Sequence, residues 1–273
     1  MTHEEIKSCC ADAYSRDIVA MLLGDSYHPG GTALTRRLAD RLALAPGMRI
    51  LDVASGRGTT ALLLADAYRV RADGIDYAPA NTALAQGAAQ AAGLTDRAAF
   101  TTGDADHLPY ENAVFNAVVC ECALCTFPDK AQAAVEFARV LKPGGRLGIT
   151  DVTADPDRLP PELRGLSARI ACIADARPLD DYARLLATAG LRTLTTERHD
   201  QAMIRMIDQI QARLSLLRVT APARLAEAGV DLDAAPAVLD AARAAVTDGV
   251  LGYALLTAVK SRAERPGDLP PGT

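Results

Sequence analysis

The segment Arg49–Thr60, with the sequence RILDVASGRGTT, constrains the fold of this chain more than any other. Residues 50–54 form a mostly apolar run, which is typical of a strand covered on both faces. Gly56 and Gly58 follow it, and they let the backbone approach a ligand with no Cβ in the way. A helix expected over Thr59–Tyr68 points its N-terminal amides at the same place. The pattern predicts an α/β fold that holds a nucleotide-like ligand at the turn.

Later segments repeat the alternation of buried strand and polar turn. About twenty residues after the glycine turn, a second apolar strand ends in Asp76, at a distance where a carboxylate accepts hydrogen bonds from ribose hydroxyls. A third strand ends in the acidic turn 103–107, and we expect further strands at Phe115–Val119 and Arg146–Thr150. In open α/β sheets, ligands bind beyond the carboxyl ends of the strands, so these turns predict one site.

These blocks, in this order and at these spacings, resemble the class I S-adenosylmethionine (SAM) dependent methyltransferases over about residues 30 to 200. The resemblance implies an α/β fold with a Rossmann-like, seven-stranded, mostly parallel sheet, helices on both faces, and SAM as cofactor. A nicotinamide enzyme is less favoured, because Ala61 stands where a third glycine is usual. The cofactor-binding residues implied are Asp52, Ala54, Ser55, Gly56, Gly58, Asp76, Tyr77, Asp104, Ala105 and Glu121.

Some side chains near these motifs allow more than one interpretation. Asp104 is the first choice for the adenine amino group, and Asp106 is the alternative. Glu121 is a salt-bridging residue at the sheet edge or an acid that faces the ligands. His28 is a turn residue or a contact to the cofactor's carboxylate, and His107 is expected on the surface.

The 273 residues are 49% hydrophobic, which is enough for one sizeable α/β core with chain left over. We expect an N-terminal lid and turn at 1–31, in which an amphipathic helix over 4–22 closes over the cofactor. The SAM-binding core follows at 32–200, a helical insertion at 201–250, the last strand at 251–262 and a disordered tail at 263–273. An apolar stripe in the insertion predicts core or dimer contacts; it consists of Met203, Met206, Ile207, Ile210 and Leu214.

Composition and charge limit the classes of substrate and partner that this chain is expected to bind. A net charge of -5, 4% aromatic residues and no Trp argue against nucleic acid as substrate. No apolar run approaches the ~18 residues that span a bilayer. We therefore expect a cytoplasmic protein, a monomer or homodimer, that acts on a small molecule or a metalloid.

Six cysteines in a chain without a secretory signal are expected to be reduced thiols. Cys120, Cys122 and Cys125 follow the fourth strand, where ligands of such sheets bind, so these thiols are expected to face the methyl donor. Two other interpretations stay open. The thiols pack as small buried hydrophobes, or they bind a structural zinc ion together with Cys172.

A narrower resemblance concerns the run Cys122–Lys130, followed by 135–145 and 150–152, which is similar to the arsenite methyltransferase family. It implies trivalent arsenic as substrate, with Cys122, Cys172 and Cys10 or Cys9 as catalytic thiolate ligands, and an external thiol reductant such as glutathione or thioredoxin. This chain departs from the family at Ser55, where the family has a cysteine.

The same SAM-binding residues are compatible with other methyl acceptors. One alternative is a small-molecule O-, N- or C-methyltransferase whose cysteines only pack. A second is a non-catalytic thiol module that binds metalloids. Selenium, tellurium or a methylated arsenical are further acceptors that the sequence leaves open.

Overall fold

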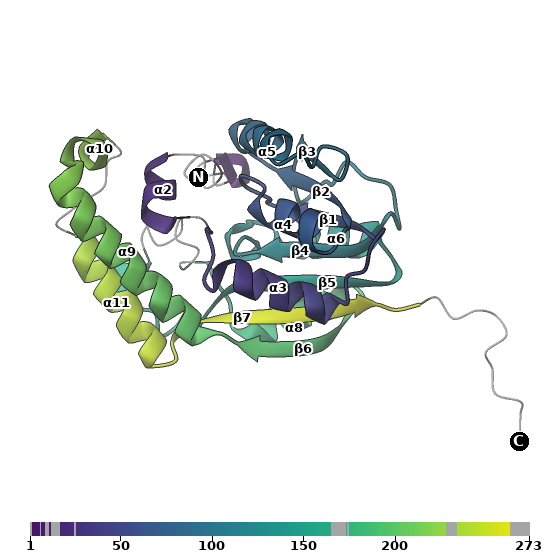
Figure 1. Ribbon diagram of the computed structural model, residues 1–273. Coiled ribbons are helices and arrows are strands. Elements are labelled where there is room, and N and C mark those ends of the chain that lie inside the picture. The colour runs from purple at the N-terminus through teal and green to yellow at the C-terminus, as the bar shows by residue number, and fades with distance from the viewer. Residues whose placement is uncertain are drawn as a thin grey trace, which may run out of the picture.

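The computed structural model describes residues 2–5, 7–8, 11, 17–24, 26–164, 173, 175–227 and 234–262. Its centre is a seven-stranded sheet with the strand order β3-β2-β1-β4-β5-β7-β6 (Figure 1). The strands are β1 Arg49–Val53, β2 Arg71–Asp76, β3 Ala98–Thr102, β4 Phe115–Glu121, β5 Leu141–Ala154, β6 Leu191–Arg198 and β7 Leu251–Lys260.

Strand β7 is antiparallel to both of its neighbours, β5 and β6, whereas β1 to β5 pair in parallel. This mostly parallel sheet with one reversed strand confirms the predicted fold class. Because the five parallel strands point the same way, their carboxyl ends and the turns after them meet at one edge.

Helices cover both faces of the sheet, as the apolar strands require. Helices α3 Gly31–Leu42, α4 Thr59–Ala67 and α5 Pro79–Ala91 contribute to one hydrophobic cluster, and α6 Lys130–Val140 and α8 Leu179–Thr188 contribute to the other. Alternate residues of β1 divide between them: Ile50 packs with the first cluster and Leu51 with the second.

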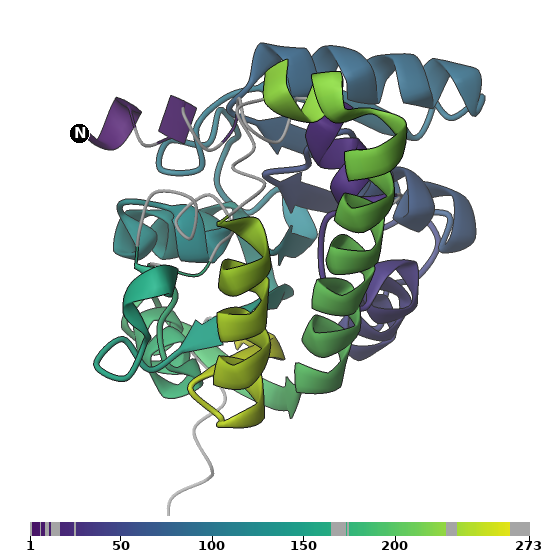
Figure 2. The ribbon, with the colours of Figure 1, turned by 90° about the vertical axis from the view of Figure 1, so that its left-hand side faces the viewer.

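The chain between β6 and β7 forms three helices, α9 Asp200–Thr220, α10 Pro222–Glu227 and α11 Ala235–Thr247. Helices α9 and α11 run side by side and extend past the edge of the sheet (Figures 1 and 2). Helix α2 Asp17–Leu23 packs on α9, and the Arg213 guanidinium donates to the Leu22 carbonyl at 3.0 Å. The predicted helical insertion is thus present, and it packs against the N-terminal region.

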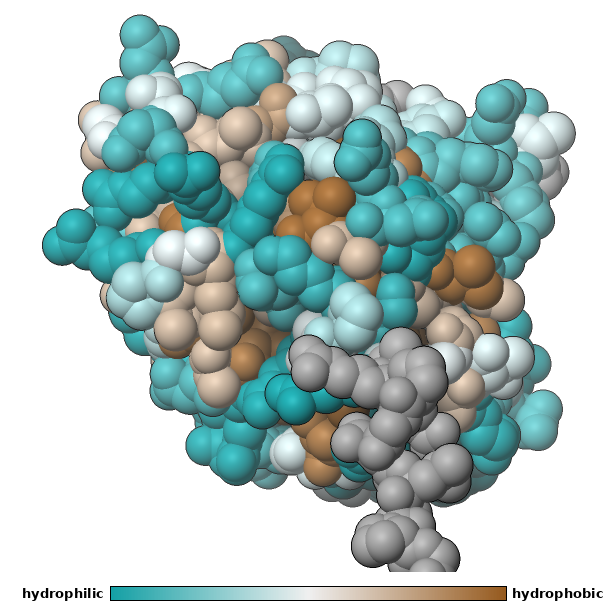
Figure 3. All heavy atoms as spheres, turned by 90° about the vertical axis from the view of Figure 1, so that its right-hand side faces the viewer, coloured by the Kyte–Doolittle hydropathy of each residue, from teal (hydrophilic) through white to brown (hydrophobic). Residues whose placement is uncertain are grey.

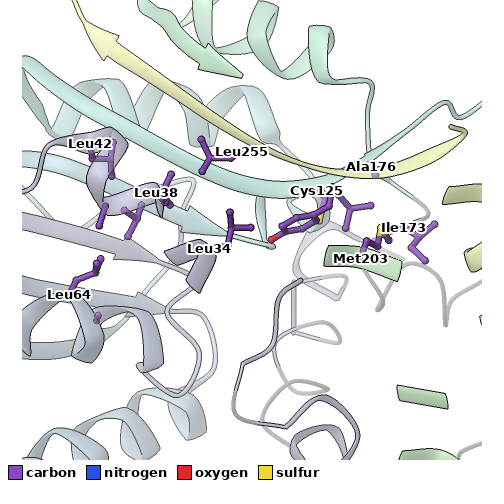
Figure 4. Packing of buried hydrophobic residues seen from close by; sticks show 14 of the residues in the cluster. Leu34, Leu38, Leu42, Leu64, Cys125, Ile173, Ala176, Met203 and Leu255 are labelled. Carbon is purple, nitrogen blue, oxygen red and sulfur yellow. The ribbon is translucent and has the colours of Figure 1, made fainter. Parts of the chain in front are cut away.

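The insertion's apolar stripe is mainly core. Met203, Ile207 and Leu214 are buried, and the first two belong to the large cluster that also contains Cys125, Ile173 and Ala176 (Figure 4). Burial inside one chain explains this stripe without a dimer contact.

Several predicted boundaries were wrong. The fifth strand is longer than 146–150, because β5 pairs with β7 as far as Ala154 and its first residue pairs with Phe115 across an irregularity. Within the predicted core, α3 ends at Leu42, since Ala43 turns to a φ of +53°. Helix α2 supplies the end of the helix expected over 4–22, much of which lies outside the described residues, as does the tail from 263.

Figure 3 shows the face on which the long strand β7 ends. Hydrophilic atoms cover much of that face, and the strongly apolar atoms form small separate groups. Among the helices that the structure describes, none is long and apolar enough to cross a membrane.

Candidate cofactor and acceptor site

A cavity of about 440 Å³ opens at the carboxyl ends of β1, β2 and β4. Its walls come from the turn after each of these strands, from the acidic turn after β3, and from the N-terminal region through Lys7, Ala11, Ala20 and Gly24. The sheet edge and the described part of the N-terminal region thus both contribute to its wall. Of the ten residues expected to bind the cofactor, nine line this cavity: Asp52, Ala54, Ser55, Gly56, Asp76, Tyr77, Asp104, Ala105 and Glu121.

The two glycines of the turn, Gly56 and Gly58, differ in what surrounds them. Gly56 has a φ of +53°, and a Cβ built there would meet nothing within 4 Å, so this backbone faces open cavity. Gly58 has a φ of +85°, and a Cβ there would lie 2.7 Å from the Phe100 ring and 2.9 Å from the Ala85 Cβ. Gly58 is not among the residues that line the described cavity, and the lack of a Cβ there allows the turn to pack closely on β3 and α5.

Asp76, at the end of β2, holds the glycine turn in place. Its Oδ2 accepts a hydrogen bond from the Gly56 N–H at 2.8 Å, and its Oδ1 accepts from the Ala78 N–H at 2.9 Å and from the Asn81 amide at 3.0 Å. A carboxylate offers about four acceptor positions, so one remains on Oδ2 for a ligand hydroxyl. The geometry is compatible with the predicted ribose contact.

Asp52 is fully buried beneath the turn, where its Oδ2 accepts from the Ala61 N–H at 3.0 Å. Burial raises the pKa of its carboxyl well above the ordinary value, and the nearby charge of Glu121 raises the pKa further. Because a positive charge beside a carboxylate favours its ionised form, this end of the cavity is suited to a cationic ligand.

Glu121 is held by hydroxyl groups from three separate elements. Its Oε2 accepts from Thr35 of α3 at 2.9 Å and from Thr60 of α4 at 2.7 Å, and its Oε1 accepts from Thr150 of β5 at 3.2 Å. His28 Nε2 lies 3.6 Å from Oε2. This network fixes α3 and α4 against the end of β4, where Glu121 and its neighbour in the chain, Cys122, both line the cavity.

The described cysteines lie in three different environments. Cys122 lines the cavity with a φ of +54°, and its N–H donates to the Thr150 carbonyl at 2.6 Å. Cys120 is buried in the cluster under α6, where burial raises the pKa of its thiol well above the ordinary value. Cys125 is buried in the opposite cluster, close to Ile173 and Met203 (Figure 4).

The three thiols at and after the end of β4 therefore do not converge, and the prediction that all of them face the methyl donor was wrong for Cys120 and Cys125. Within the described part of the chain, no group of three or more His, Cys, Asp or Glu side chains is arranged to hold a metal ion. Cys9, Cys10 and Cys172, the other predicted thiolate ligands, lie outside the described residues.

The cavity fits the cofactor that the sequence implies. An open glycine backbone faces it at Gly56, Asp76 and the acidic turn lie where the ribose and adenine are expected, and two buried carboxylates, Asp52 and Glu121, suit the positive charge of SAM. When bound, SAM supplies an electrophilic methyl group.

Comparison with known proteins agrees with this geometry. Residues 44–197 match a family model described as "Methyltransferase domain". The chain belongs to the class I SAM-dependent methyltransferases. It is 31% identical to 27-O-demethylrifamycin SV methyltransferase from Amycolatopsis mediterranei, over 91% of this chain and 94% of that one.

One further relative and one solved structure extend the comparison. The methyltransferase is 30% identical to an arsenite methyltransferase from Halobacterium salinarum, over 59% of this chain and 41% of that one. Its fold matches phosphoethanolamine N-methyltransferase 2 from Haemonchus contortus, with a TM-score of 0.79 at 17% identity over 96% of this chain and 60% of that one.

Sequence reasoning missed several residues of the cavity wall. Lys7, Arg57, Thr60 and Phe127 all line it. The position of Arg57 between the two glycines was a local signal that could have identified it. Lys7 carried no such signal, because its partners lie about a hundred residues further along the chain.

Proposed function

We propose that this enzyme transfers the methyl group of SAM to a hydroxyl group of an organic small molecule. The observation that carries the proposal is the extent of the similarity to the rifamycin O-methyltransferase. It spans 91% of this chain and therefore reaches beyond the shared segment 44–197 into the regions that enclose the acceptor end. The similarity to the arsenite methyltransferase covers 59% of this chain and 41% of that protein.

The less polar residues of the cavity wall support an organic acceptor. They include the small residues Ala20 and Gly24 and the aromatic residues Tyr27 and Phe127, with Thr126 beside Phe127. Apolar surface with a few polar groups is typical of sites for small organic molecules. Methylation of a hydroxyl also releases a proton, and His28, which lines the cavity beside Glu121, is the candidate to accept it.

Arsenic remains the second candidate acceptor, and Cys122 is the observation that favours it. Its thiol lines the cavity at the end of β4, where the arsenite methyltransferase family has a substrate-binding cysteine. Trivalent arsenic held by thiolates keeps a lone pair that can attack the methyl group once the two are aligned. This reaction would need Cys172 and Cys10 or Cys9 as further ligands, and glutathione or thioredoxin as reductant.

The two candidates differ in how they depend on Cys122. The test measures S-adenosylhomocysteine formation by the purified, reduced enzyme with SAM. One set of reactions contains 27-O-demethylrifamycin SV and a panel of phenols and hydroxylated macrocycles; the other contains arsenite with glutathione. Cys122→Ser is compared with Cys125→Ala, which changes a buried cysteine outside the cavity wall.

Turnover with an organic hydroxyl acceptor that survives in Cys122→Ser is the expected result. Mass spectrometry of the product then locates the added methyl group on oxygen. Turnover that requires arsenite and is lost in Cys122→Ser but not in Cys125→Ala would replace this proposal with arsenic methylation. Methylation of nitrogen or carbon in the same acceptor panel would also refute it.

A further inference from the structure

Helix α2 lies between the helical insertion and the cavity. One of its faces packs on a small hydrophobic cluster from α9 and α10, to which α2 contributes Ile18, Met21 and Leu22. Ala20 and Gly24 line the cavity. Because a helix has about 3.6 residues per turn, Ala20 and Gly24 share the face opposite to those three apolar side chains. Helix α2 is therefore a wall with α9 on one side and the cavity on the other, as Figure 1 also shows.

Arg213 of α9 holds the end of this wall. Its Nη1 donates to the Leu22 carbonyl at 3.0 Å, in the last turn of α2, where carbonyls lack a partner within the helix. A Cβ built on Gly24, which has a φ of +82°, would lie 2.5 Å from Nη2 and 2.8 Å from Cζ, so the guanidinium lies directly against this residue. Arg213 does not line the described cavity. Any effect of Arg213 on a ligand therefore passes through the end of α2.

Among the described contacts, those on the insertion side hold α2 more firmly than those on the sheet side. On the sheet side, Asp17 pairs with Arg57 of the glycine turn at 3.1 Å, but the side chain of Asp17 is 95% exposed. Exposed ion pairs of this kind contribute little to stability. On the insertion side, the hydrogen bond from Arg213 is charge-assisted and partly buried, and the apolar face of α2 is packed. The position of α2 therefore depends mainly on α9.

The cavity face of α2 offers shape rather than polar groups. Ala20 and Gly24 have no polar side-chain atoms, whereas Asp52 and Asp76, the acids suited to the cofactor, lie on the sheet edge. Both acids belong to the segment 44–197 that matches the methyltransferase family, and α2 and α9 lie outside it. The cofactor is common to the family, while the names of two relatives specify different acceptors, a rifamycin and arsenite. Elements outside the shared segment are thus suited to distinguish acceptors.

We propose that Arg213 is a positioning residue for the methyl acceptor: it holds Gly24 and the end of α2 in place as a wall that the acceptor contacts. Through this contact, the insertion between β6 and β7 acts on the acceptor without touching it. The proposal rests on the proposed function, because it requires an organic acceptor large enough to reach α2.

The first test compares acceptor kinetics with cofactor binding. Arg213→Met removes the hydrogen bond to Leu22 and keeps an unbranched side chain. With an organic acceptor that the wild type methylates, the KM for the acceptor should rise about tenfold in this variant. The Kd of S-adenosylhomocysteine, measured by isothermal titration calorimetry, should change by less than about twofold. Arg243→Met is the matched control, because Arg243 of α11 pairs with Asp208 of α9 and does not line the described cavity.

A double-mutant cycle tests whether the effect passes through Gly24. Gly24→Ala places a Cβ where the guanidinium lies, so it should displace Arg213 and raise the acceptor KM by a similar factor. If both changes act on the same contact, the double variant should raise KM by much less than the product of the two single effects. Gly24→Ala by itself also serves as the test if Arg213→Met fails to fold.

The outcomes separate this proposal from the proposed function. An unchanged acceptor KM in Arg213→Met, or a Kd of S-adenosylhomocysteine that rises as much as KM does, would overturn the positioning role and leave the proposed function intact. An equal rise in KM for Arg243→Met would also overturn it, because the effect would then belong to the insertion as a whole. If the wild type methylates none of the organic acceptors, the proposed function fails, and this inference fails with it.

Discussion

The two glycines of the cofactor turn should fail in opposite ways when each is changed to alanine. Gly58→Ala should lower the free energy of unfolding, because its Cβ would lie 2.7 Å from the Phe100 ring and 2.9 Å from the Ala85 Cβ. Gly56→Ala places its Cβ in open cavity, so it should cost only the backbone strain of its positive φ and should weaken cofactor binding.

The magnitude follows from two terms. A non-glycine residue at a φ of +85° costs roughly 1–2 kcal/mol in backbone strain, and overpacking in a tight core adds about 1–3 kcal/mol. Gly47 isolates the first term, because it has a φ of +82° with nothing within 4 Å of its Cβ position and does not line the described cavity. The lower unfolded-state entropy of alanine offsets about 0.4–1 kcal/mol of the loss in all three variants.

Urea unfolding followed by circular dichroism, without cofactor, should therefore rank Gly58→Ala about 1–3 kcal/mol below Gly47→Ala. Gly56→Ala should match Gly47→Ala in stability, while calorimetry shows a loss of SAM affinity for Gly56→Ala alone. Equal unfolding free energies for Gly58→Ala and Gly47→Ala would refute the packing argument. Unchanged SAM affinity in Gly56→Ala would refute the assignment of Gly56 to the cofactor wall.

Three further predictions concern buried charges and thiols. Because burial raises the pKa of Asp52, its carboxyl stays protonated to a higher pH in the folded state than in the unfolded chain. The free energy of unfolding without cofactor should therefore fall as pH rises above about 4, and urea titrations of Asp52→Asn should show a smaller fall. Arg139 lowers the pKa of Glu136 through a hydrogen-bonded ion pair, so this pair stabilises the fold at pH values above the ordinary glutamate pKa. The stabilisation is lost as pH falls below that pKa. Arg139→Ala should therefore lower the free energy of unfolding by about 3 kcal/mol near pH 7 and reduce its dependence on pH in the acid range. Brief treatment with iodoacetamide at pH 8, read by peptide mass spectrometry, should label Cys122 before Cys120, because Cys120 is buried and the pKa of its thiol is raised; equal labelling would contradict the described burial.

Much of the cofactor site could be predicted from the sequence because its parts are local. The strand, the glycine turn and the helix after them are continuous in the chain, and Asp76 follows at a spacing set by one strand–helix–strand unit. Parallel strands bring such turns to the same edge. The order of the motifs was therefore enough to predict the fold and nine of the residues that line the cavity.

The partners of these residues could not be predicted in the same way. The carboxylate of Glu121 is bound by hydroxyls from α3, α4 and β5, and Lys7 reaches Asp104 across 97 positions. Contacts of this kind depend on the position and orientation in which the helices pack against the sheet. No local pattern in the sequence encodes them.

For the cysteines, the sequence predicted their position along the sheet, but only the tertiary structure determined their environments. The sequence by itself determined that Cys120, Cys122 and Cys125 lie at or just after the carboxyl end of β4, at the ligand edge of the sheet. Because ligands of such sheets bind at this edge, all three thiols were expected to face the methyl donor. Cys122 leaves the strand at a φ of +54° and faces the cavity, while Cys120 packs under α6 and Cys125 packs in the opposite cluster. Only the packed structure decided which thiol meets the ligand, because that choice depends on one backbone angle and on the helices that cover each face.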